Sequence, residues 1–220
     1  MSASRPSHPP PSWNGEVDKV KEARSRGDAA AAITTANAAA DNIESHVGET
    51  MAGSADENEA LTAAQRFTFN VAADAWPGWQ RDGPLPDKPT LLRAKRLAQR
   101  SASLVDRLKL GPVQVGTGAW LVGAFDLVLG NFEEALARFS AASDNYHAAS
   151  APGLELLTSG YAVMARGLWA SKSEDDIAGD LDRVIAQILA GSFEDGEEWA
   201  EQLRTALAVV SRKEYREIWS

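Results

Sequence analysis

Apolar residues recur every three or four positions along most of this chain, which is the spacing that places them on one face of an α-helix. Residues 131–148 show the pattern best, because Glu133, Glu134 and Arg138 fall off the apolar face. Alternating apolar and polar runs, which predict β-strands, are nearly absent, and alanine is abundant. We therefore expect an all-α protein. The apolar face of residues 131–148 carries Phe132, Ala135, Leu136, Phe139, Ala142 and Tyr146.

The connections between the periodic segments are mostly short, so consecutive helices should run antiparallel. One connection is longer, PGWQRDGPLPDK, because four prolines in and just after it and two glycines prevent a helix. Residues 1–14 are rich in proline, and we expect a disordered tail there, followed by one α-helical domain over 15–220. The expected helices span 15–26, 28–46, 56–76, 88–109, 112–129, 131–148, 153–170, 174–190 and 195–217.

The stretch LVLGNFEEALARFSAA combines a turn glycine, Gly130, with alanines and phenylalanines in the following helix. Gly123 stands in the preceding helix. Glycine and alanine let two helix backbones approach closely, and an aromatic side chain fills the remaining space. A weaker copy, EARSRGDAAAAITTANAA, has its turn glycine at Gly27, 103 residues earlier.

This pattern resembles the tetratricopeptide repeat (TPR), and 103 residues is close to three of its 34-residue periods. The resemblance implies antiparallel helical hairpins, about nine helices in all, stacked as a right-handed solenoid. It also implies a protein- or peptide-binding scaffold, without catalytic activity, whose groove is lined by the first helix of each hairpin. An irregular helical bundle is the alternative fold.

The composition disfavours several classes of protein. A net charge of −9 is a poor match for a nucleic-acid backbone. The chain has no cysteine, so it has no disulfide and no thiolate zinc site. No apolar run reaches the roughly 18–20 residues of a membrane-spanning helix, and the first residues lack a secretory signal. We therefore expect a cytoplasmic protein that binds neither nucleic acid nor membrane.

No motif indicates an active site. The glycines of VQVGTGAWLVG lack the third position of a dinucleotide-binding turn, so they are better explained by helix packing. Ser143, Asp144 and His147 share one helix, but nothing indicates a strained nucleophile or an oxyanion hole. One Asp–His pair also provides too few ligands for a metal ion. We expect no catalytic residue, no metal and no cofactor.

Residues 88–109 carry a net charge of +6 in this acidic chain. Arg93, Arg96 and Arg100, followed by Arg107, lie on one ridge of the expected helix. Arginine binds carboxylates and phosphates with two parallel hydrogen bonds. The ridge could therefore dock an acidic peptide or a phosphorylated partner. Alternatively, it pairs with acidic residues of this protein itself, within or between chains, such as Glu194, Asp195, Glu197 and Glu198.

Two further features mark the expected groove. Arg66 and Asn70 are four residues apart on the first helix of a hairpin, and some peptide-binding TPR domains use such a pair to hold a terminal carboxylate. Trp76 and Trp79 flank the long loop, either as a hydrophobic plug or as an aromatic platform. Our predicted partner site consists of Arg66, Asn70, Trp120 and three arginines of the ridge, Arg93, Arg96 and Arg100. A small-molecule or enzymatic pocket near Trp76 and Trp79, or a self-associating structural subunit, are the alternatives.

Overall fold

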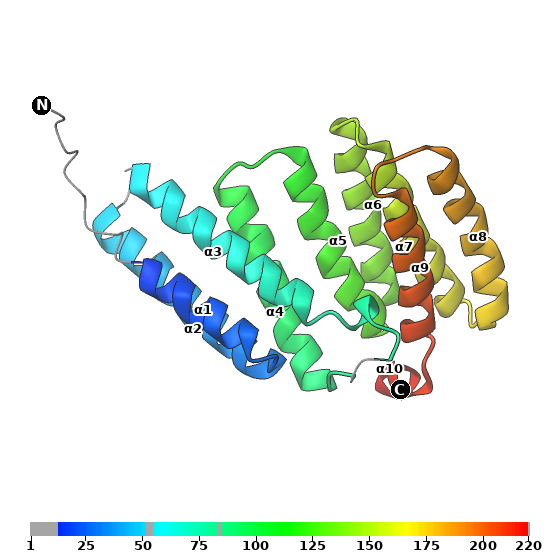
Figure 1. The fold of residues 1–220 in the computed structure, drawn as a ribbon, viewed down its shortest axis with the longest axis horizontal. Helices are drawn as coiled ribbons and strands as arrows, with labels where there is room; N and C mark the ends of the chain where they lie inside the picture. The colour runs from blue at the N-terminus through cyan, green and yellow to red at the C-terminus, as the bar shows by residue number, and fades with distance from the viewer. Residues whose placement is uncertain (1–12, 52–54, 83–84, 220) are drawn as a thin grey trace, which may run out of the picture.

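A computed structural model describes residues 13–51, 55–82 and 85–219, and these residues form ten α-helices and no β-strand (Figure 1). The expected all-α class is therefore confirmed. A π-helical segment (Val47–Met51) and a 3-10 turn, η2 (Pro77–Trp79), complete the helical elements. The helices are α1 (Asn14–Ser25), α2 (Ala29–His46), α3 (Ala55–Asp74), α4 (Lys88–Arg107), α5 (Pro112–Val128), α6 (Phe132–Ala148), α7 (Pro152–Trp169), α8 (Glu174–Ala190), α9 (Gly196–Val210) and α10 (Lys213–Trp219).

The first eight expected helices lie within two residues of their observed bounds. The expectation of one last helix over 195–217 is wrong, because the chain turns at Ser211 and begins α10. The turn allows Tyr215 to be fully buried and brings the Trp219 indole against Phe132 of α6, with ring centroids 5.1 Å apart. A straight helix would leave both aromatic residues in solvent, so burial of apolar area favours the break.

Most of the expected N-terminal tail, residues 1–12, lies outside the described residues. The last two residues assigned to that tail are described. Trp13 is buried, and Asn14 is the first residue of α1.

Side chains in the loops cap the N-termini of several helices. The Asp28 carboxylate accepts a hydrogen bond from the Ala31 amide of α2, and Ser173 Oγ accepts one from the Asp176 amide of α8. Asp87 does the same for Thr90 in α4, and these hydrogen bonds to Thr90 hold the pKa of the Asp87 carboxyl below its usual value. Each contact satisfies an amide that the first helical turn leaves without a partner.

The short turns that follow six of the helices share one backbone geometry. In each of them the second residue after the helix has a positive φ. At Gly130 and at Ser171 the amide of this residue and the amide of the next residue donate to carbonyls near the helix end, which is the Schellman arrangement. The turn after α7 therefore adopts the geometry of the glycine turns without a glycine. The six residues are Gly27, Lys109, Gly130, Ser150, Ser171 and Ser192.

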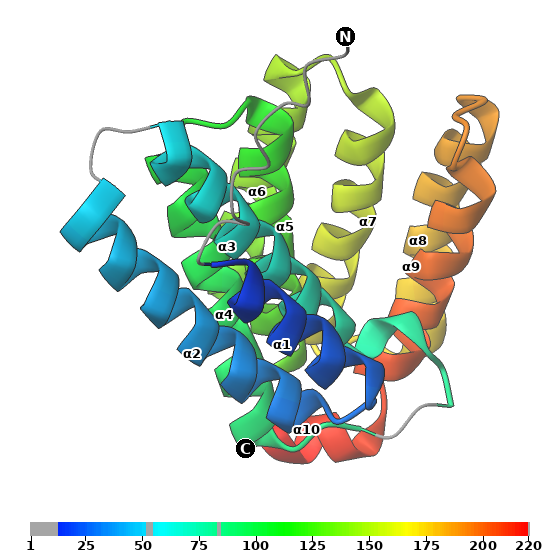
Figure 2. The ribbon, with the colours of Figure 1, turned by 60° about the vertical axis from the view of Figure 1, so that its left-hand side comes forward.

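Consecutive helices pack against one another and follow the chain across the molecule (Figures 1 and 2). The glycines of α5 allow the closest approach. A Cβ atom on Gly116 would lie 2.9 Å from the Tyr146 ring of α6, and one on Gly123 would lie 2.9 Å from Phe139. Helix packing therefore explains these glycines. Between Gly27 and Gly130 the described residues form the four expected helices, α2 to α5, although 103 residues is close to three 34-residue units of two helices each.

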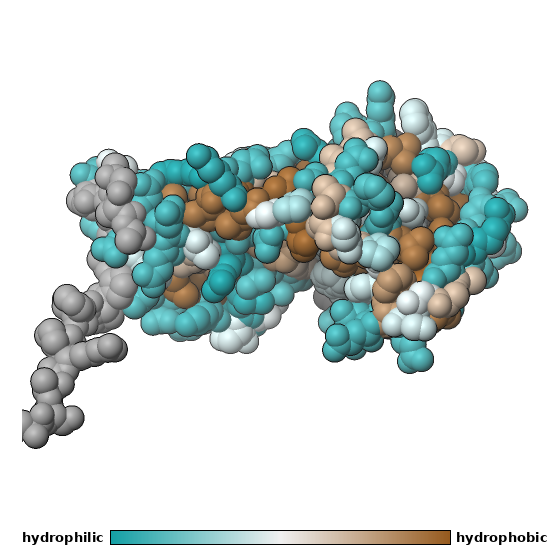
Figure 3. All heavy atoms as spheres, turned by 90° about the horizontal axis from the view of Figure 1, so that it is seen from above, coloured by the Kyte–Doolittle hydropathy of each residue, from teal (hydrophilic) through white to brown (hydrophobic). Residues whose placement is uncertain are grey.

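Apolar surface remains between the helices. Viewed from above, bands of hydrophobic residues lie between hydrophilic side chains along the molecule (Figure 3). No helix among the described residues has the length and apolar character needed to span a membrane.

Candidate functional site

Helices α1 and α3 form an open groove of about 350 Å³. Trp13, Val17 and Phe67 provide an apolar floor, and Arg66 and Asn70 of α3 stand exposed at the rim. The groove thus contains the two residues of α3 that the sequence singled out. Its lining residues are Trp13, Asn14, Val17, Val20, Lys21, Arg24, Glu59, Thr62, Ala63, Arg66, Phe67 and Asn70.

The basic residues of the groove differ in how they are held. Arg24 forms two hydrogen bonds with Asp74 at the end of α3, Nε to Oδ2 at 2.6 Å and Nη2 to Oδ1 at 3.1 Å. Lys21 lies 3.2 Å from Asp18 on the same exposed turn. The side chains of Arg66 and Asn70 form no hydrogen bond or ion pair with another described residue. A ligand therefore meets a guanidinium and an amide that have no partner in the described part of the chain.

Three groove residues escaped the sequence-based prediction. Lys21 and Arg24 are three apart on α1, a spacing that would have placed them on one face, but no local signal says that this face meets α3. Trp13 was assigned to the tail, yet it is buried against the core, and its indole Nε1 has no hydrogen-bond partner in the described chain. A tryptophan immediately before an amphipathic helix was the available signal for it.

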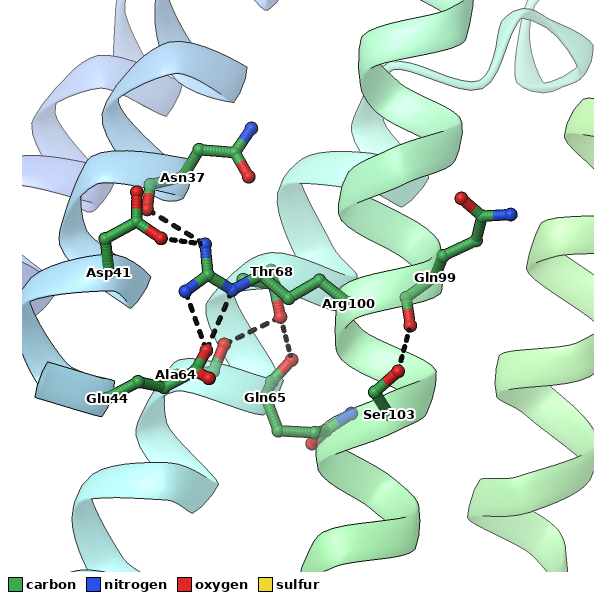
Figure 4. A network of polar contacts seen from close by, with 9 residues as sticks. All are labelled: Asn37, Asp41, Glu44, Ala64, Gln65, Thr68, Gln99, Arg100 and Ser103. Atoms are coloured by element: carbon green, nitrogen blue, oxygen red, sulfur yellow. Dashed lines mark hydrogen bonds and ion pairs between the residues drawn. The ribbon is translucent and has the colours of Figure 1, made fainter. Parts of the chain in front are cut away.

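Two arginines of the α4 ridge, Arg100 and Arg107, pair with the protein's own carboxylates, and Figure 4 shows the contacts of Arg100. Its guanidinium is 2.7 Å from Glu44 and 2.8 Å from Asp41, both on α2, and it also donates to the Asn37 carbonyl. Arg107 is 2.9 Å from Glu57 of α3. These acidic partners are on neighbouring helices and are not the expected residues Glu194, Asp195, Glu197 and Glu198.

The other two ridge arginines remain exposed. Arg93 donates a hydrogen bond to Thr90 Oγ1 of its own helix at 3.2 Å, and Arg96 has no partner among the described residues. The ridge therefore faces α2, α3 and solvent, whereas Arg66 and Asn70 line the groove between α1 and α3. The structure does not bring these two sets into one site.

The tryptophans of the long loop lie in an aromatic cluster with Trp120 of α5 and Tyr161 of α7. Trp76 is 2% exposed and packs edge-on against both, with ring centroids 6.1 and 5.7 Å apart. Trp79 is 41% exposed, and its indole donates to the Ala73 carbonyl at 2.6 Å. Trp76 is thus a plug in the core, Trp120 is covered by it, and only Trp79 offers an aromatic surface.

A second cleft, of about 460 Å³, lies beside Trp79, where the turn after α1 meets the long loop. Its two carboxylates already have partners, because Asp28 caps α2 and Asp74 binds Arg24. Neither carboxylate is available as a general acid or base without breaking these contacts.

The Ser143, Asp144 and His147 set stays on the surface of α6, where His147 Nδ1 lies 3.5 Å from Glu155 of α7. Within the part of the chain that is described, no three His, Asp or Glu side chains are grouped to hold a metal ion. Comparison of the chain with protein-family models, curated proteins and solved structures finds no match.

Proposed function

We propose that this protein is a TPR-like stack of helical hairpins that binds a protein or peptide partner in the groove between α1 and α3, without catalysing a reaction. Support for the stack comes from the antiparallel order of neighbouring helices and from the repeated turn geometry. Equivalent turn residues Lys109 and Ser150, and likewise Gly130 and Ser171, are 41 residues apart. The unit is longer than the 34 residues of a TPR, so the likeness lies in the arrangement of helices rather than in the repeat length.

One observation carries the binding proposal. The unpaired guanidinium of Arg66 and the amide of Asn70 stand over the apolar floor of Trp13 and Phe67. A floor of this kind accommodates an apolar side chain, and a guanidinium binds a carboxylate with two hydrogen bonds. Lys21 and Arg24 also line the groove, but they are paired with Asp18 and Asp74, so Arg66 is the lining cation that attracts a negatively charged partner. We therefore assign it an acidic peptide that carries an apolar residue.

The exposed residues Arg93 and Arg96 are not part of this groove. They are available to a larger acidic partner that also reaches α4. A small-molecule or enzymatic site beside Trp79 is the weaker alternative, because the carboxylates of that cleft have partners within the chain.

Fluorescence anisotropy with a labelled peptide of alternating Glu and Leu residues tests the proposal. The matched control peptide replaces each Glu with Gln. We expect the acidic peptide to bind. Arg66→Glu should lower its affinity by about tenfold or more, which corresponds to the loss of one hydrogen bond to a charged group. Arg138→Glu, an exposed reversal on α6, should leave the affinity unchanged. Equal binding of the two peptides, or equal effects of the two variants, contradicts the proposal.

A further inference from the structure

A separate groove of about 290 Å³ lies between α6 and α7, remote in sequence from α1 and α3. The contact of His147 with Glu155 gives the register of these antiparallel helices. In the same register Ser143 lies level with Ser159, and Leu136 lies level with Arg166. All four of these residues line the groove, which agrees with that alignment. The groove therefore runs along at least two turns of both helices.

Of the four hydroxyl side chains that line this groove, Ser159 donates to the Glu155 carbonyl at 2.9 Å, and the other three lack such a contact. Ser140, Ser143 and Thr158 form no side-chain hydrogen bond with another described residue. Three other threonine hydroxyls within helices donate to the carbonyl four residues earlier. These are Thr34, Thr68 and Thr117.

Thr158 gives an independent indication of a ligand. The residue is 1% exposed, lines the groove, and has a buried Oγ1 without a partner in the described chain. Leaving a buried hydroxyl without a hydrogen bond costs about 1–3 kcal/mol. Because Oγ1 is buried beneath the groove surface, a ligand atom recovers that loss only when the side chains around Thr158 move to admit it.

The charges of the groove stand at opposite ends. In this register Arg166 is level with Leu136, and Asp144 is level with Thr158. Leu136 and Asp144 are eight residues apart on α6, so the two charged residues are separated by about 12 Å along the helix axis. Neither Arg166 nor Asp144 forms an ion pair with another described residue. A ligand that uses both ends must therefore present different chemistry to each.

Each end selects a chemical group. Arg166 is suited to the oxygens of a phosphate, which accept two parallel hydrogen bonds from a guanidinium. An ionised Asp144 only accepts hydrogen bonds and repels an anion, so the other end of the ligand must carry donors. The hydroxyls between them donate and accept equally well. We propose that this groove binds a small phosphorylated polyol, such as a sugar phosphate, with its phosphate on Arg166 and a hydroxyl donating to Asp144.

Calorimetric titration with glycerol 3-phosphate, a pentose 5-phosphate and a hexose 6-phosphate tests this site, with inorganic phosphate and the unphosphorylated hexose as reference ligands. At least one phosphorylated polyol should bind more tightly than both references. Arg166→Ala and Asp144→Asn should each weaken binding by about tenfold, the effect of one charged hydrogen bond. Arg138→Ala, on the other side of α6, is the control and should change nothing.

Thr158→Val separates ligand binding from folding, because it keeps the shape of the side chain and removes no internal hydrogen bond. We expect the melting temperature to be unchanged or raised while the polyol phosphate binds more weakly. Absence of binding by all three phosphorylated polyols overturns the proposal. Inorganic phosphate binding as tightly as they do, or Thr158→Val leaving their affinity unchanged, overturns it as well.

Discussion

Trp76, in the loop after α3, packs edge-on against Tyr161 of α7, with 5.7 Å between the ring centroids. The 3-10 turn that follows Trp76 also packs against α9. The long loop thus ties the first helices of the chain to the last ones. It is a structural connection as well as a link between α3 and α4.

Truncation of this plug should weaken the whole fold. We expect Trp76→Ala to lower the free energy of unfolding by about 3–5 kcal/mol, because a buried aromatic residue leaves both lost contacts and a cavity. Urea unfolding followed by circular dichroism measures the change. The control is Trp169→Ala, since Trp169 is 56% exposed and its truncation should cost far less. If the two variants lose similar free energies of unfolding, Trp76 does not connect the first helices of the chain to the last ones as described.

A part-buried ion pair joins α4 to the end of α5. Lys95 Nζ lies 2.5 Å from Asp126 Oδ1, and the Asp126 side chain, 2% exposed, also accepts a hydrogen bond from Asn131. Asp126→Ala leaves the lysine charge without its partner and should destabilise the protein by about 3–5 kcal/mol.

The double replacement Lys95→Met with Asp126→Leu should recover most of that loss, because it removes both charges together. For comparison, Glu16→Ala breaks an exposed pair with Lys19 and should cost at most about 1 kcal/mol. A double variant that is no more stable than Asp126→Ala would contradict this description of the pair.

The serine turns offer a gain in stability. Ser150 has a φ of 54°, a conformation that costs a residue other than glycine about 1–2 kcal/mol. Ser150→Gly should therefore raise the free energy of unfolding by about 1 kcal/mol. Ala137→Gly in the middle of α6 should lower it by about 0.5–1 kcal/mol. Thermal and urea unfolding of both variants provide the measurement, and a loss on Ser150→Gly would contradict the assigned backbone geometry.

These turns also explain how far the sequence could predict the fold. Helix extents follow from local signals, such as the apolar spacing of α6 and the capping residues Asp28 and Ser173. A residue with a positive φ can be recognised in the sequence only where it is glycine. Gly130 therefore indicated a turn, and Ser171 did not. The repeated geometry after α7 consequently had no signature.

Contacts between distant segments were the other part that could not be predicted. The periodicity of α4 predicted a ridge containing Arg100, but it could not indicate Glu44 as the partner. The choice of Arg66 and Asn70 rested on their spacing and on the resemblance to peptide-binding TPR domains, and both line the groove between α1 and α3. Lys21 and Arg24 were missed because their role depends on α1 lying beside α3. The turn at Ser211 has neither glycine nor proline, and only the burial of Tyr215 accounts for it.

All three tyrosines of the chain should make the protein sensitive to alkaline pH. Burial raises the pKa of the Tyr146, Tyr161 and Tyr215 hydroxyls above the usual value of about 10. Above that pH the unfolded chain loses phenolic protons that the folded chain retains, so stability is complete below about pH 10 and falls as pH rises. Tyrosinate absorbance should therefore increase together with the loss of helical circular dichroism.

Tyr161→Phe should reduce the slope of stability against pH in this alkaline range. At neutral pH it should cost about 1 kcal/mol, because Gln202 loses the hydrogen bond that it donates to the Tyr161 hydroxyl. Reversible ionisation of all three tyrosines near pH 10 in a protein that keeps its helical signal would contradict this prediction.

The most direct test of the proposed function locates the peptide on the protein. The chain has seven tryptophans, whose indole N–H signals can be followed by nuclear magnetic resonance, and Trp13 lies in the groove while Trp76 and Trp120 lie in the aromatic cluster. Titration with the acidic Glu–Leu peptide should move the Trp13 signal, identified by its loss in Trp13→Phe, and leave those of Trp76 and Trp120 in place. A shift confined to Trp76 or Trp120, or no shift at Trp13, would contradict the proposal of a peptide-binding groove between α1 and α3.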